Sequence, residues 1–371
     1  MLGPTRTFLA LRRDADSGLL AAVATVSITF AATPFLLQPI ADEFGVSLGQ
    51  AGLMSTAQVG TFALVVFVAG RRLSTDRRFL VGAALASTVV NLLSVVVSTY
   101  GLLLALRMAA GAATGIMVWL SWTKAMRLSG SMRRVAAAGP LTVLVAAPII
   151  AGLATGGGSD AVFLFLAVTS LPASVLPAEF AGYRQQRRRM SPSRSNVVLV
   201  VAMGIMTMSA SSLFIYAATR GDGIGVSPLI ISLAFSANAL VGFFAARLPP
   251  GDRSAGMWVL GMALCAGAVG FGEDGALFVA GLAAWGFCFW MATTRLLAMI
   301  AAWSLAPDER VGDTQSAMAI GRAIGPAVGA MFVGDGAFGA VTTFAVVGLA
   351  IAGSTVLGVD RHRRGLDPPT P

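Results

Sequence analysis

The stretch GRRLSTDRRFL, residues 70–80, is a short charged loop between two long apolar runs. A near copy, ARLPPGDRSA, stands between two other apolar runs at residues 246–255. Each contains Arg-Leu, then two or three small or turn-forming residues, then Asp-Arg. The two aspartates, Asp76 and Asp252, are 176 residues apart. This echo at about half the chain length predicts two halves that are built alike.

The composition is that of a membrane protein. Of 371 residues, 56% are hydrophobic and 12% are charged, whereas a soluble domain has about 25% charged residues. Turn and charge clusters separate twelve apolar runs, each close to the roughly 20 residues that cross a bilayer as a helix. The run after Ser17 is full length, so we expect a first span there and not a cleaved signal peptide. The expected spans are 17–38, 48–69, 79–98, 100–123, 135–155, 160–178, 197–218, 227–247, 255–272, 275–303, 314–333 and 336–358.

The distribution of Lys and Arg predicts the orientation of these spans. With the N-terminus in the cytoplasm, 22 of the 26 Lys and Arg residues fall in cytoplasmic loops and tails. Arg220 falls outside, and Arg107, Arg295 and Arg322 fall within spans. Cytoplasmic loops of membrane proteins are enriched in basic residues, so we expect both termini to be cytoplasmic. The same rule explains the net charge of +9 by contact with anionic lipid, and no nucleic-acid partner is expected.

Several motifs resemble those of the major facilitator superfamily, and the resemblance covers essentially the whole chain. The family's loop between the second and third spans usually reads Gly-x-x-x-Asp-Arg-x-Gly-Arg-Arg. Here Gly70, Asp76 and Arg77 match, with extra residues before the aspartate and without the second glycine. Three further stretches are similar to family motifs: RMAAGAATG at 107–115, APIIAG at 147–152, which is similar to a Pro-Gly motif of the antiporter branch, and PDERVGDTQSAMAIGRAIGPAVG at 307–329.

The resemblance implies an all-α polytopic membrane protein with two six-helix bundles related by pseudo-two-fold symmetry. The chain would then divide into a cytoplasmic N-tail at 1–16, an N-terminal half at 17–182, a basic cytoplasmic linker at 183–196, a C-terminal half at 197–359 and a cytoplasmic C-tail at 360–371.

Small and charged residues at equivalent places in the two halves suggest moving parts. The family resemblance implies a cytoplasmic latch between the halves, although an aspartate at a helix start can equally be a simple cap. The latch candidates are Arg72, Asp76, Arg77, Asp252 and Arg253. Glycines four residues apart let helices approach closely, and prolines within spans favour bending. The hinge and packing candidates are Gly111, Gly115, Pro148, Gly152, Gly321, Gly325, Pro326 and Gly329.

Ionisable residues within spans are costly and are functional candidates by default. Arg107 is the best candidate for a functional charge. Arg295 could instead extend toward the cytoplasm, and Arg322 is expected to be structural. Every Asp and Glu lies in a tail, a loop or at a span end, which disfavours a cationic substrate and leaves Asp42 as the proton-carrying candidate.

In the family, the first, fourth, seventh and tenth spans line a central cavity, and polar stripes on these spans predict a solute site. Hydroxyl stripes can also bond back to their own helix. The cavity candidates are Thr29, Thr33, Gln38, Arg107, Thr114, Trp119, Ser212, Tyr216, Phe289, Trp290 and Arg295.

These observations predict a secondary transporter that moves a small organic solute by alternating access, with export favoured because of the antiporter-like motif. Uptake or facilitated movement of an organic anion is one alternative, and a non-transporting sensor or scaffold is another. With His362 as the single histidine and no paired carboxylates within spans, neither an enzyme, a metal site nor a cofactor is expected. The expected partners are lipid, a solute with an apolar and anionic character, and a proton counter-ion. The expected state is a monomer in a bacterial inner membrane, since arginine outnumbers lysine 25 to 1.

Overall fold

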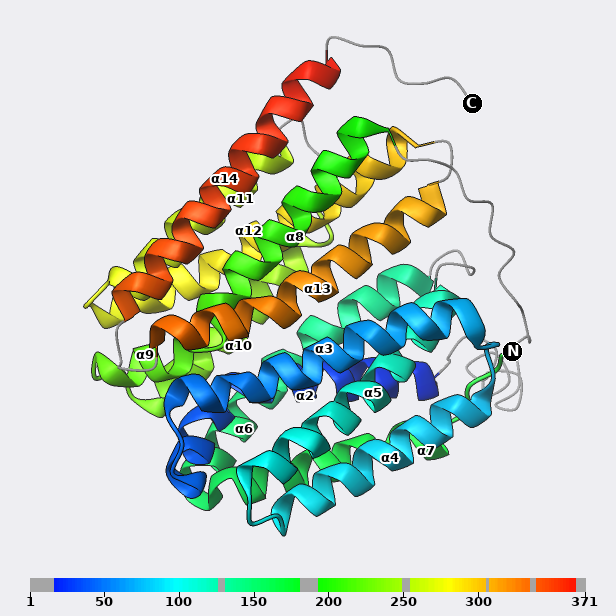
Figure 1. The fold of residues 1–371 in the computed structure, drawn as a ribbon, viewed down its shortest axis with the longest axis vertical. Helices are drawn as coiled ribbons and strands as arrows, with labels where there is room; N and C mark the ends of the chain where they lie inside the picture. The colour runs from blue at the N-terminus through cyan, green and yellow to red at the C-terminus, as the bar shows by residue number, and fades with distance from the viewer. Residues whose placement is uncertain are drawn as a thin grey trace, which may run out of the picture.

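The computed structural model describes residues 17–125, 131–180, 193–248, 254–304, 307–333 and 338–364, and the regular structure of these residues is helical (Figure 1). The helices are α2 (Ser17–Phe44), α3 (Leu48–Arg72), α4 (Arg77–Val95), α5 (Tyr100–Ala125), α6 (Ser131–Ser170), α7 (Pro172–Val175), α8 (Arg194–Phe214), α9 (Ala217–Gly223), α10 (Pro228–Ala245), α11 (Ala255–Phe271), α12 (Gly275–Ala302), α13 (Pro307–Val333) and α14 (Phe338–Arg364).

The helices overlap the expected spans, with a difference at the fifth and sixth. Both of these spans lie in α6, which comprises two helices that meet at a kink, where Gly158 leaves helical geometry at φ 65° and ψ −157°. Only glycine adopts such a conformation readily, so this residue allows the chain to turn. The helix ends at Ser170 and the four-residue α7 follows, so the expected span at 160–178 was too long.

Ten helices of the described chain are long and apolar enough to cross a membrane, and α11 is a shorter apolar helix. Because α6 combines two segments and α11 is short, a total of twelve spans stays a prediction.

Short polar residues determine where many of these helices begin. The Ser47 side chain accepts a hydrogen bond from the Gln50 amide, and the Gln50 side chain accepts one from the Ser47 amide. Asp76 likewise accepts from the Arg78 amide at 2.9 Å. Each cap satisfies amide groups that the first helical turn leaves free. Further caps of this kind are Ser193, Ser227, Ser254 and Asp274.

The helices pack as two bundles with the same pattern of neighbours. In the first, α2 packs on α6, α3 on α5, and α4 on both α5 and α6. In the second, α8 packs on α13, α10 on α12, and α11 on both α12 and α14. Two seams join the bundles, one between α3 and α13 and the other between α6 and α10 (Figure 1). The repeated pattern of neighbours is the structural counterpart of the sequence echo.

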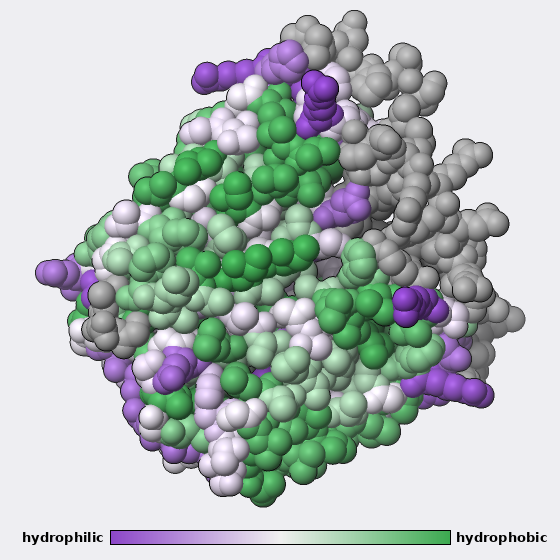
Figure 2. Space-filling model, in the orientation of Figure 1, coloured by the Kyte–Doolittle hydropathy of each residue, from purple (hydrophilic) through white to green (hydrophobic). Residues whose placement is uncertain are grey.

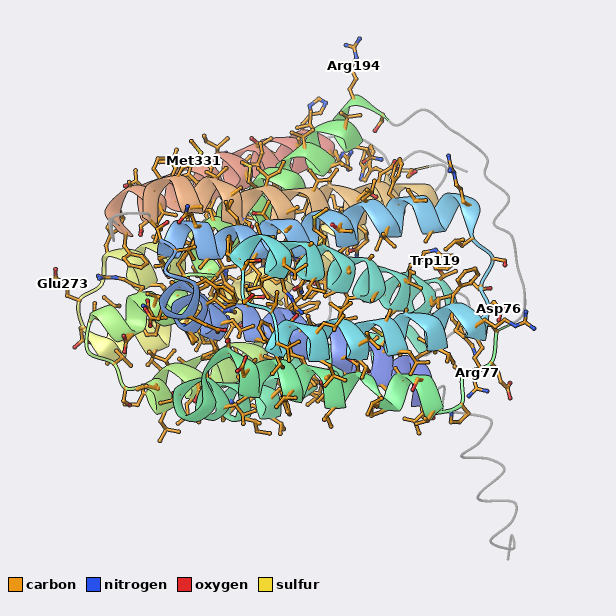
Figure 3. All side chains as sticks on the ribbon, turned by 60° about the horizontal axis from the view of Figure 1, so that its bottom comes forward. Asp76, Arg77, Trp119, Arg194, Glu273 and Met331 are labelled. Atoms are coloured by element: carbon orange, nitrogen blue, oxygen red, sulfur yellow. The ribbon has the colours of Figure 1, made fainter. Side chains whose placement is uncertain are left out.

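Charged side chains gather at the two ends of the bundles. One end, which we call the acidic end, carries Arg220 together with six carboxylates. The other, the basic end, carries the described loops rich in arginine. Figure 3 shows Glu273 at the acidic end and Asp76, Arg77 and Arg194 toward the basic end. Between the ends, apolar side chains cover most of the visible surface in Figure 2. The six carboxylates are Asp42, Glu43, Asp160, Asp222, Glu273 and Asp274.

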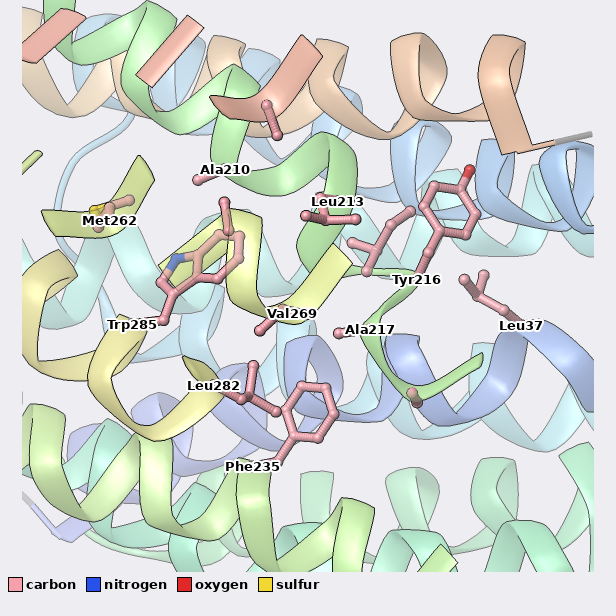
Figure 4. Close-up of a cluster of buried hydrophobic side chains, with 14 of the residues drawn as sticks. Leu37, Ala210, Leu213, Tyr216, Ala217, Phe235, Met262, Val269, Leu282 and Trp285 are labelled. Atoms are coloured by element: carbon pink, nitrogen blue, oxygen red, sulfur yellow. The ribbon is translucent and has the colours of Figure 1, made fainter. Parts of the chain in front are cut away.

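The largest buried apolar cluster crosses both bundles, and Figure 4 shows part of it, including Leu37 of α2 with Tyr216 and Phe235 of the second bundle. Phe35 of α2 and Phe235 of α10 have ring centroids 5.1 Å apart. A separate cluster, which includes Leu19 and Leu80, belongs to the first bundle alone. The two bundles therefore share one apolar core, which contains Phe35 and Phe235, and the first bundle has a second core around Leu19 and Leu80.

Candidate functional site

Arg322 is an exposed cation in the middle of a helix. It lies 15 residues after the first residue of α13, Pro307, and 11 before the last, Val333, and its side chain is exposed. In the described part of the chain its guanidinium has neither an ion-pair partner nor a hydrogen-bond acceptor, and its recorded contact is the ring of Phe289 on α12. The guanidinium carbon is 5.4 Å from the ring centroid.

The exposed side of Arg322 faces the interior of the protein. Ile320, Ile324 and Met331 are 54%, 45% and 81% exposed and share one outward face of α13. Residues two positions apart on a helix differ in direction by about 200°, so Arg322 points away from this face. The packing of the adjacent residues supports this direction, because Gly321 packs against α8 and Ala323 packs against Gly60 of α3. Arg322 thus projects between α8 and α3, toward α12.

Aromatic rings surround this region at the same depth. Phe289 packs edge-to-face with Trp290, with centroids 5.8 Å apart. In the first bundle, Phe30 of α2 packs edge-to-face with Phe62 of α3 at 5.3 Å. All four rings are partly exposed. Phe62 is two residues from Gly60, where α3 meets α13, so both bundles place an aromatic residue near the level of Arg322.

Thr293 adds an unsatisfied polar group beside these rings. It follows Phe289 by one helical turn on α12 and is 4% exposed. Its hydroxyl has no hydrogen-bond partner among the described residues. A buried hydroxyl without a partner is uncommon, and a solute with an oxygen atom could provide one. Gln315, seven residues before Arg322 on the same face of α13, is also exposed.

Arg107, the predicted functional charge, lies in a different environment. It is 1% exposed, and it donates hydrogen bonds to Asn91 at 3.0 Å and to Ser94 at 2.5 Å, both on α4. The ring of Phe163 on α6 lies 4.6 Å from the guanidinium carbon. These contacts place Arg107 inside the first bundle as a link between α4, α5 and α6, and it offers no exposed surface to a solute in this conformation.

Most of the predicted hydroxyls bond to carbonyls of their own helices. Thr29 donates to Thr25 at 2.8 Å, Thr114 to Ala110 at 2.8 Å and Ser212 to Ser209 at 2.8 Å. Thr29, Thr33, Thr114 and Ser212 are all buried. These hydroxyl groups are therefore already hydrogen-bonded to their own helices, which makes them less available to a solute.

The remaining predicted cavity residues divide between the interior and the ends. Trp119 is buried in the core of the first bundle. Arg295 lies beside Trp258 of α11, 5.5 Å from its ring centroid, on another side of α12 from Phe289. Gln38 is exposed at the acidic end and donates to Asp42 at 2.9 Å. Phe289 is the predicted residue that contacts Arg322, and Trp290 packs on Phe289 and on Gly242 of α10.

At the acidic end, Tyr216 closes the seam between the bundles. Its side chain is fully buried, and its hydroxyl donates to the Pro326 carbonyl at 3.3 Å within the second bundle. Gly52 of α3 packs so closely on the Tyr216 hydroxyl that a Cβ there would clash. Nearby, Gly49 packs on the Ala330 backbone of α13.

The same face of α3 continues toward the basic end. Gly49, Gly60 and Phe67 are spaced by 11 and 7 residues, which places them on one side of a helix. Gly49 and Gly60 face α13, and Phe67 is 46% exposed. The α3–α13 seam is therefore closely packed toward the acidic end, at Gly49 and Gly52.

The sequence matches the family model described as Major Facilitator Superfamily over residues 18–330. The chain belongs to the major facilitator superfamily. It is a multi-pass membrane transporter and not an enzyme, and its all-helical fold is that of the family.

Two solved structures of the superfamily have a similar fold over nearly the whole chain. A bacterial homologue of the human lysosomal transporter Spinster, solved in an inward-facing and occupied conformation, is 13% identical with a TM-score of 0.73, and the match covers 100% of both chains. The nucleoside transporter NupG, in a variant form, is 11% identical with a TM-score of 0.70, and the match covers 93% of this chain and 99% of NupG. A search of curated protein sequences gave no match.

The superfamily loop after the second span is seen here as a capped turn. Asp76 begins α4, and Arg72 and Arg77 are exposed. Asp252 and Arg253, the counterpart in the second half, lie outside the described residues. The cap is thus present, and a latch between the halves stays a prediction.

The glycines of the superfamily motifs are mostly packing sites. A Cβ at Gly111 or Gly115 would meet the α3 backbone, and one at Gly321, Gly325 or Gly329 would meet α8. A Cβ at Gly152 would meet nothing within 4 Å, so Gly152 is not a packing site here, and a role as a hinge stays a prediction. Pro148 and Pro326 lie within continuous helical stretches, and the break in α6 is at Gly158.

Proposed function

We propose that this transporter exports a small organic solute by alternating access, with the acidic end outside and both termini in the cytoplasm of a bacterial cell. The α3–α13 seam carries the proposal: Tyr216 closes it at the acidic end, as one of two alternating states requires. A carrier needs two such states around a central site. The excess of arginine at the basic end supports the orientation.

We also propose that the solute has an apolar body and a negative charge. At mid-depth the described spans carry Arg107 and Arg322, while the described carboxylates lie near the helix ends. A cation that faces the interior favours an anion, because an unpaired charge within a membrane is costly. Export is favoured by the antiporter-like APIIAG stretch, and Asp42 at the acidic end is the candidate for a coupled proton. We expect the protein to act as a monomer.

Uptake of an organic anion is the second candidate, and the same observation favours it, since Arg322 would serve an anion that moves in either direction. Transport by vesicles of opposite orientation separates the two directions. Inside-out vesicles that accumulate the solute support export, and accumulation in right-side-out vesicles alone supports uptake.

Distances between spin labels at the two ends test alternating access. One pair, Asp160→Cys and Glu273→Cys, spans the bundles at the acidic end, and the other, Arg78→Cys and Arg194→Cys, spans them at the basic end. All four side chains are exposed. The native thiols, Cys265 and Cys288, are buried and are replaced by alanine.

We expect two distance populations for each pair, so that conditions which lengthen the acidic-end distance shorten the basic-end distance. A control pair within the second bundle, Asp222→Cys with Glu273→Cys, should keep one distance. A single unchanging distance at both ends, in liposomes and with every solute that binds, would contradict alternating access and favour the sensor or scaffold.

A further inference from the structure

Arg322 differs from Arg107, Arg220 and Arg363 in having no acceptor among the described residues. Arg107 donates to Asn91 and Ser94, Arg220 donates to the Gly272 carbonyl at 3.0 Å, and Arg363 donates to Asn196 at 2.8 Å. Each of these three is bound within its bundle. Arg322 contacts the ring of Phe289 instead, and the described residues offer no acceptor to the five N–H donors of its guanidinium.

A guanidinium with free donors is suited to one class of ligand group. Its planar fork matches the two oxygens of a carboxylate, and such paired charge-assisted hydrogen bonds are among the strongest in proteins. The ring of Phe289 beside the guanidinium is apolar, and a charge pair is stronger in such surroundings than in bulk water. The charge and the donors of Arg322 therefore both favour an anionic group.

The rings around Arg322 indicate what the carboxylate is attached to. Phe289 lies beside the guanidinium in the second bundle, and Trp290 packs edge-to-face on Phe289. Aromatic rings pack well against flat apolar groups. The unpartnered hydroxyl of Thr293, one turn from Phe289 toward the basic end, would give a polar substituent a partner.

We propose that Arg322 binds the carboxylate of a planar organic acid, whose apolar body packs on Phe289 between the two bundles. This inference rests on the proposed transport function and names its substrate class. Because the site adjoins the α3–α13 contact at Gly60, the ligand touches both bundles, and its binding responds to their relative position.

A thermal-shift measurement on the purified full-length protein tests the proposal. The probes are benzoate and phenylacetate, each compared with its neutral amide, benzamide or phenylacetamide, which has nearly the same shape. We expect the acids to raise the melting temperature in a concentration-dependent manner and the amides to bind at least tenfold more weakly. Equal effects of acid and amide, or no effect of either acid, would overturn the proposal.

Variants locate the binding to Arg322. Arg322→Gln should weaken benzoate binding at least tenfold, a typical loss when one partner of a buried charge pair is removed, and Arg322→Lys should retain part of it. Arg295→Gln is the matched control, since Arg295 lies on α12 beside Trp258 and not at the site. If Arg322→Gln and Arg322→Lys both bind benzoate as the native protein does, the site is elsewhere.

The outcome is distinguishable from failure of the transport proposal. If the spin-label distances alternate but no acid binds through Arg322, the substrate class alone is wrong. If acids bind through Arg322 and the distances never change, the site is correct and the alternating-access proposal is wrong.

Discussion

Replacement of Tyr216 by alanine should open the acidic end. The ring is fully buried and contacts both bundles, since Pro326 and Gly329 belong to the second and Gly52 belongs to the first. When the bundles separate at this end, the contacts within the second bundle persist, whereas the contact with α3 is lost. The ring therefore stabilises the closed acidic end relative to the open one.

The size of the change in the open-to-closed ratio depends on how much of the Tyr216 packing energy comes from contacts across the seam. Truncation of a buried aromatic side chain to alanine costs about 3–5 kcal/mol, and we assign roughly half, about 2 kcal/mol, to the contact across the seam. A difference of about 1.4 kcal/mol is tenfold in an equilibrium constant, so Tyr216→Ala should raise the open-to-closed ratio about thirtyfold. Tyr216→Phe removes the hydroxyl, with its hydrogen bond to Pro326 and its contact with Gly52, but keeps the ring in the seam, so it should change the ratio less than about threefold.

The spin-label pair at Asp160 and Glu273 measures this ratio directly, because both positions are exposed and remote from the substituted ring. Phe278→Ala is the matched control, since Phe278 is fully buried and packs on Gly221 within the second bundle. This control should lower the melting temperature without lengthening the distance. If Tyr216→Ala lowers the melting temperature equally and leaves the distance distribution as in the native protein, Tyr216 does not act at the seam and the reasoning is refuted.

Three predictions concern stability. Gly325→Ala should lower the free energy of unfolding by about 1–3 kcal/mol, because its Cβ would clash with the Met208 carbonyl. Gly152→Ala, the control, should be neutral. Equal melting temperatures of the two variants would show that α13 can shift to accommodate the extra methyl group. Arg363→Ala should cost about 2 kcal/mol or more, since the buried guanidinium donates to α8 and α12, and an unchanged melting temperature would disprove this link. Asp76→Ala should cost about 1 kcal/mol by loss of the cap while Asp76→Asn costs less, and a large effect of Asp76→Asn on the spin-label distances would favour the latch instead.

The sequence predicted the fold through features that act locally. Apolar runs of spanning length, Ser and Asp caps such as Ser47 and Asp76, and the repeated Arg-Leu…Asp-Arg loop all depend on residues close together in the chain. The close helix contacts at Gly111 and Gly325 were also predictable, because four-residue glycine spacing is a local pattern. The break at Gly158 falls between the expected fifth and sixth spans, where three successive glycines mark the boundary.

The candidate site was not predictable in the same way. Both Arg107 and Arg322 are arginines within apolar spans, and the sequence does not show which hydrogen-bond acceptors the folded chain brings to either guanidinium. Position on the helix was a usable signal, since Arg322 lies opposite Ile320 and Ile324 on α13. What the sequence did not show was which helix packs on each side of α13.

The sequence by itself determined a membrane protein with two similar halves and a basic end, because the apolar length of a span and the charge of a loop are properties of short segments. Only the tertiary structure decided that Arg107 is bound to Asn91 and Ser94 while Arg322 is left beside Phe289. The cost of a charge in a membrane depends on its acceptors, and those acceptors come from helices distant in the chain.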